Sequence, residues 1–302
     1  MVRPGACSLW PDRRTVLTAA GMLLAAALPV RAARTGPRLA AIDWAMLETA
    51  VAIGHMPVAA CELIRFREDA VSPAIPEGVV DLGLRGSPNF ELLQLTRPDL
   101  ILTSPYYTQY ESRLRTLAPV LNLPFYAPGE PPLPKAFVAL HTMADAVEDP
   151  HAGRRAIERS EEELRELSLR LAPYADRAVC LVNIGDARHL RAFGFDSLFG
   201  DTLGRLGLTN AWTAATRFSF LAPVPIEELA AMPDARLVIV GQIPVEARRG
   251  LSRSVLWQAL PPVAEGRVYQ LADVNPYGAV PAALRFARLM ADAFEAGPTG
   301  LA

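Results

Sequence analysis

The sequence has few of the residues on which most metal and nucleophilic chemistry depends. It contains three cysteines and four histidines in 302 residues. The histidines (His55, His141, His151 and His189) are scattered and lack the spacing of a metal site. There is no glycine-rich phosphate loop, no nucleophile elbow and no cysteine cluster. These absences argue against an enzyme, and we interpret Asp186-Ala187-Arg188-His189 as the end of a strand and not as a catalytic group.

No apolar run is long enough to span a membrane. The longest, Leu17–Val30, has about 14 residues against the ~20 that a membrane helix needs. It follows Arg13-Arg14, and small residues precede Ala33, so residues 1–32 are predicted to be an export signal that is cleaved after Ala32. The paired arginines indicate the twin-arginine route. Cys7 lies before the apolar run, which argues against a lipoprotein, and we expect a mature protein free in the periplasm.

Positive charge is scarce once this signal is removed. Residues 33–302 hold 26 basic and 31 acidic residues, a net charge of about −5. A mildly acidic protein is not a nucleic-acid binder on bulk charge. Two cysteines remain, Cys61 and Cys180, among apolar neighbours. We expect two buried free thiols, with a single disulfide as the alternative in an oxidising compartment.

The most clearly predicted element is a long helix over residues 149–173. Asp149 can cap it, Pro150 suits its first position, and Ala172-Pro173 ends it. Its apolar stripe is narrow, and the remaining surface carries oppositely charged residues four positions apart, which is typical of a solvated helix. The stripe consists of Ile157, Ser160, Leu164, Leu167 and Leu171.

Short apolar runs alternate with helical segments on both sides of this helix, which favours mostly parallel sheets covered by helices. The expected strands are 39–42, 58–61, 79–82, 100–103 and 120–125, then 178–184, 190–193, 237–240 and 268–271. The expected helices are 46–53, one from Asn89, 111–117 and 134–147, then 196–206, 226–232, 255–260 and 281–296.

One pattern occurs on both sides of the long helix. Glu91–Leu95 leads through Pro98-Asp99 into an apolar strand, and Glu228–Met232 leads through Pro233-Asp234 into another. Each is a short helix that stops at Pro-Asp. The sequence therefore predicts two Rossmann-like α/β lobes, residues 37–147 and 176–302, bridged by the helix at 149–173. A cleft between the lobes is the expected ligand site.

Several segments, in this order along the chain, resemble the ferric-hydroxamate (ferrichrome) binding proteins of bacterial ABC iron-siderophore importers. They are Ala41-Ile42-Asp43-Trp44, Asp81-Leu82-Gly83-Leu84-Arg85, Pro88-Asn89-Phe90-Glu91-Leu92-Leu93, Asp186-Ala187-Arg188-His189, Phe193-Gly194 with Ser197-Leu198-Phe199, Asn210-Ala211-Trp212, Leu256-Trp257-Gln258-Ala259-Leu260-Pro261 and Tyr277-Gly278-Ala279. The resemblance implies the helical-backbone (class III) fold, a monomer, and an inner-membrane permease as partner. It implies an iron(III)-siderophore as ligand and no cofactor, because the siderophore itself holds the iron.

The resemblance also assigns residues. Arg85 stands where the family has an arginine that contacts the hydroxamate oxygens, and a guanidinium suits clustered anionic oxygens. Tyr107 matches a tyrosine that reaches the same oxygens, with Tyr106 as an adjacent competitor. Tyr277 matches a tyrosine of the second lobe, and Trp44 is included as a further candidate contact.

The sequence departs from the ferrichrome binders at several of these places. Where the family has tryptophans, this chain has Thr103, Ser219 and Asn275. Arg191 and Arg217 replace an apolar and a neutral residue. We include all five as candidate contacts, and their chemistry suggests a more polar or anionic chelate, such as a citrate-type or carboxylate-bearing hydroxamate. Haem and cobalamin remain alternative ligands of the same fold.

Two glutamates are candidates for docking to the permease. In this class, an acid at the tip of each lobe pairs with permease arginines, and Glu91 and Glu227 match these positions, with Glu228 as an alternative to Glu227. A glutamate at a helix start is also favoured by the helix dipole alone. A zinc-uptake protein of this shape would need converging histidines or acids, which the sequence does not show.

Overall fold

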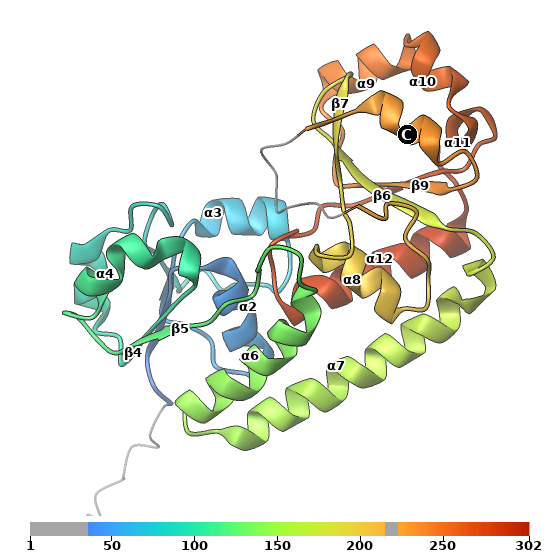
Figure 1. The fold of residues 1–302 in the computed structure, drawn as a ribbon. Helices are drawn as coiled ribbons and strands as arrows, with labels where there is room; N and C mark the ends of the chain where they lie inside the picture. Colours follow the sequence, from blue (N-terminus) through green and yellow to red (C-terminus); the bar gives the residue numbers. More distant parts are fainter. Residues whose placement is uncertain (1–35, 215–222, 302) are drawn as a thin grey trace, which may run out of the picture. The chain divides into compact units, whose positions relative to one another are not determined.

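The computed structural model describes residues 36–214 and 223–301 (Figure 1). The predicted export signal, and Arg217 and Ser219 among the candidate contacts, lie outside the described residues. In the part that is described, no helix combines the length and the apolarity needed to cross a bilayer.

The N-terminal lobe is built on a parallel sheet with the strand order β3-β2-β1-β4-β5. Its strands are β1 Leu39–Ala41, β2 Ala59–Ala60, β3 Val80–Asp81, β4 Leu100–Thr103 and β5 Val120–Asn122. Its helices are α2 Trp44–Ala52, α3 Leu63–Arg65, the π-helix η1 Phe66–Ala70, α4 Phe90–Thr96, the 3-10 helix η2 Pro105–Tyr110, α5 Glu111–Leu114 and α6 Pro132–Ala146.

The C-terminal lobe, which follows the long helix, has a mixed sheet with the order β10-β9-β6-β7-β8. β6, β9 and β10 are parallel, whereas β7 and β8 are antiparallel to their neighbours. The strands are β6 Val179–Ile184, β7 His189–Ala192, β8 Val224–Pro225, β9 Arg236–Val240 and β10 Val268–Leu271. The helices are η3 Ala172–Tyr174, α8 Leu198–Arg205, the 3-10 helix η4 Ile226–Ala231, α9 Val245–Ser252, α10 Val255–Ala259, α11 Pro261–Ala264 and α12 Val280–Ala296.

The long helix is α7, Pro150–Leu171, and it begins as predicted (Figure 1). The Asp149 carboxylate accepts from the backbone N–H of Ala152 at 3.0 Å. The predicted stripe is buried except for Ile157, which is partly exposed, and it packs on α6 and α12. At Gly153, α7 approaches α6 so closely that a Cβ added to this glycine would lie 2.6 Å from Cβ of Ala144.

The charges of α7 do more than keep it solvated, which corrects the sequence-based interpretation. Arg170 reaches α12, where its guanidinium pairs with Asp292 at 2.8 Å and with Glu295 at 2.8 Å. Glu163 of α7 accepts hydrogen bonds from the guanidinium of Arg288, which is also on α12; one of these bonds is 2.9 Å long. These partners lie on a neighbouring helix and not four residues along α7, because α12 runs within reach of this face.

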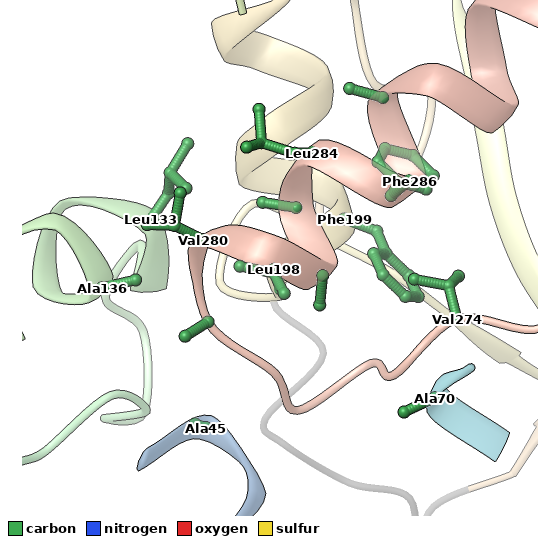
Figure 2. Close-up of a cluster of buried hydrophobic side chains, with 14 of the residues drawn as sticks. Ala45, Ala70, Leu133, Ala136, Leu198, Phe199, Val274, Val280, Leu284 and Phe286 are labelled. Atoms are coloured by element: carbon green, nitrogen blue, oxygen red, sulfur yellow. The ribbon is translucent and has the colours of Figure 1, made fainter. Parts of the chain in front are cut away.

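One apolar core extends through both lobes. β1 turns Leu39 and Ala41 to this core, and β6 turns Val179 and Leu181 to it, because alternate strand residues face opposite sides of a sheet. Figure 2 shows where the lobes meet, with side chains of α6, α8 and α12 packed together. The labelled residues from these helices are Leu133, Ala136, Leu198, Phe199, Val280, Leu284 and Phe286. The second face of each sheet has a smaller core of its own.

The repeated pattern of the sequence corresponds to equivalent units of the two lobes. α4 leads into β4, and η4 leads into β9, each through a Pro-Asp pair. The two units differ in that the second helix is 3-10 and not α. Cys61 and Cys180 are buried free thiols, as expected, and burial raises the pKa of both, that of Cys180 to about 12.

Candidate functional site

A pocket of 410 Å³, called the interlobe pocket below, lies at the carboxyl ends of the N-terminal strands and includes a residue of the C-terminal lobe. Ligands of open α/β sheets commonly bind at this edge, where the loops after parallel strands converge. The lining residues are Asp43, Ala45, Arg85, Ser104, Pro105, Tyr106, Tyr107, Phe125, Tyr126 and Tyr277. The structure thus brings four of the predicted contacts together: Arg85, Tyr106, Tyr107 and Tyr277.

Arg85 is held from two sides. Its Nε donates to Oε2 of Glu62 at 2.9 Å, and its backbone N–H donates to Oε1 of the same carboxylate at 3.2 Å. The guanidinium carbon lies 3.9 Å from the ring centroid of Trp44, a cation–π contact. Trp44 is itself anchored, since its indole N–H donates to the carbonyl of Cys61 at 3.1 Å and its ring meets Phe66 edge-on.

This arrangement leaves the outer end of the Arg85 guanidinium available. Within residues 36–214 and 223–301, no acceptor is bonded to its Nη1 or Nη2. A guanidinium stays charged and presents its donors as a planar fork, which matches paired anionic oxygens. Glu62 and Trp44 therefore fix the position of the Arg85 guanidinium and leave its Nη1 and Nη2 groups able to donate to a ligand.

Asp43 places a carboxyl group in the same pocket. It caps α2, where its Oδ1 accepts from the N–H of Ala45 at 2.7 Å, and its Oδ2 accepts from the Ser104 hydroxyl at 3.0 Å. Burial raises the pKa of Asp43, although these hydrogen bonds and the nearby Arg85 act in the opposite direction. Asp43 limits the excess of positive charge that Arg85 brings to the pocket.

The tyrosines supply neutral donors. Burial raises the pKa of Tyr107 to about 12 and also raises the pKa of the more exposed Tyr106. Tyr126 is more deeply placed, and its hydroxyl donates to the carbonyl of Gly278 at 2.6 Å. Its ring contacts that of Tyr277 edge-on, with centroids 5.4 Å apart. The Tyr106 and Tyr107 hydroxyls stay protonated at neutral pH and can donate to a bound ligand, whereas the hydrogen of Tyr126 is already used by Gly278.

Other predicted contacts lie elsewhere. Trp44 is 6% exposed and lies beneath Arg85, so it supports the pocket instead of lining it. Thr103 is fully buried at the end of β4. Asn275 is 3% exposed, and its amide donates to Glu48 at 2.7 Å. Arg191 is on β7, opposite Asn183 of β6, and is not part of the pocket lining.

Sequence reasoning missed several lining residues, namely Asp43, Ser104, Phe125 and Tyr126. The signal that could have found them is position at the carboxyl end of a predicted parallel strand: Asp43, Ser104 and Tyr126 directly follow one, and Phe125 is the last residue of one. The missing information was which loops turn toward the second lobe.

The described residues contain no group of three or more His, Cys, Asp and Glu side chains arranged to hold a metal ion. The pocket instead combines one cationic fork with hydroxyl donors and aromatic surface. That set of groups can recognise oxygen-rich anionic or polar surfaces of a ligand.

The two candidate docking glutamates are both exposed. Glu91 is in the first turn of α4, which the Asn89 side chain caps by accepting from the N–H of Leu92 at 2.9 Å. Glu227 is in the first turn of η4, next to the exposed Glu228. Each lobe thus presents an exposed acid in the first turn of the short helix of its repeated unit.

Comparisons with known proteins agree with this architecture. The sequence profile of the periplasmic binding protein family matches residues 39–274. The iron(3+)-hydroxamate-binding protein FhuD of Escherichia coli (strain K12) is 32% identical over 285 residues, which are 93% of this chain and 96% of that protein.

Two solved structures share the fold. The Fe³⁺–Desferal-bound siderophore-binding protein FhuD of Vibrio cholerae has a TM-score of 0.80 at 24% identity, covering 87% of this chain and 100% of that chain. The petrobactin-binding protein YclQ of Bacillus subtilis has a TM-score of 0.69 at 13% identity, covering 86% and 92%. These likenesses support two α/β lobes with a long connecting helix. Together with the match over residues 39–274 and the relative at 32% identity, they show that the chain belongs to the periplasmic binding protein family.

Proposed function

We propose that the protein is a periplasmic receptor that binds an iron(III)-hydroxamate siderophore and delivers it to an inner-membrane ABC permease. The relative at 32% identity is named for iron(3+)-hydroxamate binding, and one structure with the same fold contains Fe³⁺–Desferal. Family membership supports a binding protein that performs no chemistry on its ligand. Iron is cargo here and is held by the siderophore.

The observation that carries the proposal is the convergence of Arg85 with Tyr106, Tyr107 and Tyr277 on one pocket. Hydroxamate oxygens that coordinate iron are clustered and negatively charged, so the open end of the Arg85 fork can donate to two of them. Tyr107 can donate a further bond, because its raised pKa keeps the phenol protonated. A protonated phenol does not displace a siderophore oxygen from the metal, which favours capture of the intact chelate.

The class of chelate follows from the charges. Asp43 in the lining, and Glu62 behind it as the ion-pair partner of Arg85, offset the cation, which suits a neutral hydroxamate complex. A chelate that also bears carboxylates would depend on Arg191 and Arg217, which we propose as contacts for that case only. Thr103 and Asn275 are buried and are not among the proposed direct contacts.

A fluorescence titration tests the function. Ferrichrome, Fe³⁺–Desferal, ferric citrate, haem and cobalamin are titrated separately, with quenching of Trp44 beneath Arg85 as the signal. We expect a hydroxamate complex to bind more tightly than ~10 μM, about −7 kcal/mol. If no siderophore does so while haem or cobalamin binds, the siderophore proposal is wrong.

Docking to the permease is proposed to use Glu91 and Glu227. Both are exposed acids, one on each lobe, and they can pair with arginines of two like permease subunits. The double variant Glu91→Arg with Glu227→Arg is expected to keep its siderophore affinity but to lose most iron uptake in cells. Uptake at the normal rate would remove these residues from the interface. Loss of uptake on reversal of Glu228 alone would assign the second-lobe contact to that residue instead of Glu227.

Export is proposed to use the twin-arginine route. Replacement of Arg13-Arg14 by two lysines should prevent the protein from reaching the periplasm, measured by fractionation and immunoblot. Export at the normal level would indicate the general secretory route instead.

A further inference from the structure

A buried carboxyl group joins the two lobes next to the interlobe pocket. Glu48 lies on α2, is 0% exposed, and forms no ion pair with any described residue. Its Oε1 accepts from the Asn275 amide at 2.7 Å, and its Oε2 accepts from the backbone N–H of Ala279 at 2.7 Å. Both donors belong to the C-terminal lobe, in the loop between β10 and α12.

Such a group is expensive to bury. A buried carboxylate without a cation loses hydration that hydrogen bonds replace only in part. Burial raises the pKa of Glu48 to about 8, and repulsion from the Asp43 carboxylate adds to this increase, while hydrogen bonds from Ala279, Asn275 and Ala282 act against it. An apolar side chain could fill the same space with a smaller desolvation penalty. We therefore attribute the presence of a carboxyl group here to the hydrogen bonds that it accepts.

Those bonds lead directly to a pocket residue. Asn275 uses its amide group to donate to Glu48, and its Oδ1 accepts from the backbone N–H of Tyr277 at 3.1 Å. Tyr277 lines the interlobe pocket. On the other side, the Tyr126 hydroxyl donates to the carbonyl of Gly278 at 2.6 Å. The loop 275–279 is thus held by Glu48 at Asn275 and Ala279 and by Tyr126 at Gly278.

The loop also fits closely around Glu48. A Cβ added at Gly278 would collide with both carboxyl oxygens of Glu48, so only glycine allows this approach. Glu48 lies five residues after Asp43 on the same short helix, a rise of about 7.5 Å. The helix that presents Asp43 to the pocket therefore also sets where the opposite wall stands.

We propose that Glu48 is a positioning residue of the ligand pocket: through Asn275 and Ala279 it fixes Tyr277 of one lobe relative to Asp43 and Arg85 of the other. The inference rests on the proposed function, because it takes the interlobe pocket as the ligand site. It assigns no contact between Glu48 and the ligand.

The test measures the affinity of the variants for Fe³⁺–Desferal by tryptophan fluorescence at 25 °C, after thermal unfolding has shown that each variant is folded at that temperature. Both oxygens of Glu48 accept hydrogen bonds, and a protonated carboxyl oxygen can still accept through a lone pair, whereas the amide nitrogen of Glu48→Gln cannot accept at all. The loop must then shift, and we expect at least tenfold weaker binding. Combining it with Asn275→Asp reverses the polarity of that bond, since the new amide donates to the new carboxylate, and should recover most of the lost affinity. Glu111→Gln is the matched control: Glu111 accepts from the Asn122 amide at 2.8 Å, outside the pocket lining, and its replacement should leave affinity unchanged.

A second measurement separates positioning from general support. If Glu48 acts through Tyr277, then Glu48→Gln should cost less than twofold when added to Tyr277→Ala. Full additivity, or a variant that melts earlier yet binds normally, would overturn the proposal. Should Glu48→Gln fail to fold, Asn275→Ala carries the same test, because it cuts the link to Tyr277 and leaves the Ala279 bond. Absence of Fe³⁺–Desferal binding by the unmodified protein would count against the choice of ligand and not against the role of Glu48.

Discussion

Arg85 offers the sharpest test of how the pocket recognises a chelate. Replacing it by alanine removes the open fork and, with it, one or two charge-assisted hydrogen bonds to ligand oxygens. Hydrogen bonds to charged groups contribute about 1.5–3 kcal/mol. The Arg85 side chain is 24% exposed, so solvent screens it only in part. We therefore expect the Kd for a ferric hydroxamate to rise about 10- to 150-fold.

The same substitution disturbs the protein, and this must be separated from binding. Glu62, whose side chain is 12% exposed, would lose the cation that pairs with it, and the Trp44 ring would lose its cation–π contact and become more exposed to solvent. Removal of one partner of such a pair costs about 1–3 kcal/mol of folding free energy. Adding Glu62→Gln to Arg85→Ala removes the unpaired charge, so this double variant should regain stability in urea unfolding without regaining affinity.

Arg85→Lys completes the series. A lysine keeps the charge but has no Nε–H to hold Glu62 and no fork to present beyond it, so it cannot do both tasks at once. We expect it to recover less than half of the lost binding free energy, measured by the same fluorescence titration. Normal affinity of Arg85→Ala would refute the reasoning, and full recovery by lysine would mean that charge alone is recognised.

Three further outcomes can be measured. Gly153→Ala should lower the free energy of unfolding by about 1–3 kcal/mol, since its Cβ would overlap α6, whereas Gly204→Ala, in open space on α8, should raise it by up to about 1 kcal/mol. The folded pKa of Glu48, about 8, lies above its ordinary 4.5, so its contribution to stability is complete below about pH 4.5 and is lost as pH rises to about 8. In urea unfolding between pH 5 and 8, the unmodified protein should therefore be more stable than Glu48→Gln by an amount that decreases as pH rises. A constant difference would contradict this reasoning. Tyr107→Phe should weaken ferric-hydroxamate binding by about 1 kcal/mol in the titration and Tyr106→Phe by less, because Tyr106 is 54% exposed; the reverse order would assign the role to Tyr106.

Most of the fold was predictable because local signals and burial agree along this chain. The strand at 100–103 and the helix capped by Asp149 lie where the sequence places them, since alternation, capping and proline act within a few residues. Helix α9, Val245–Ser252, was missed, because a short helix with mixed polarity has no strong period. The shared core between the lobes was also not predictable, as it depends on packing among distant segments.

The candidate site was predictable only where a residue type is tied to a role. Arg85 and the tyrosines were found through their chemistry and their place in the family pattern. Asp43 was read as part of a segment and not as a lining residue, because an N-cap and a pocket acid look alike in sequence. Asn275 was taken for a ligand contact since nothing in the sequence shows that its amide is already bonded to Glu48.

The core that runs through both lobes has a consequence for how the protein unfolds. Two sheets that look like two domains share one buried apolar interior, from Leu39 in the first strand to Phe294 in the last helix. Neither half, expressed alone, would keep that surface covered. Residues 37–302 should therefore melt in a single transition, with equal calorimetric and van't Hoff enthalpies, although the architecture has two lobes.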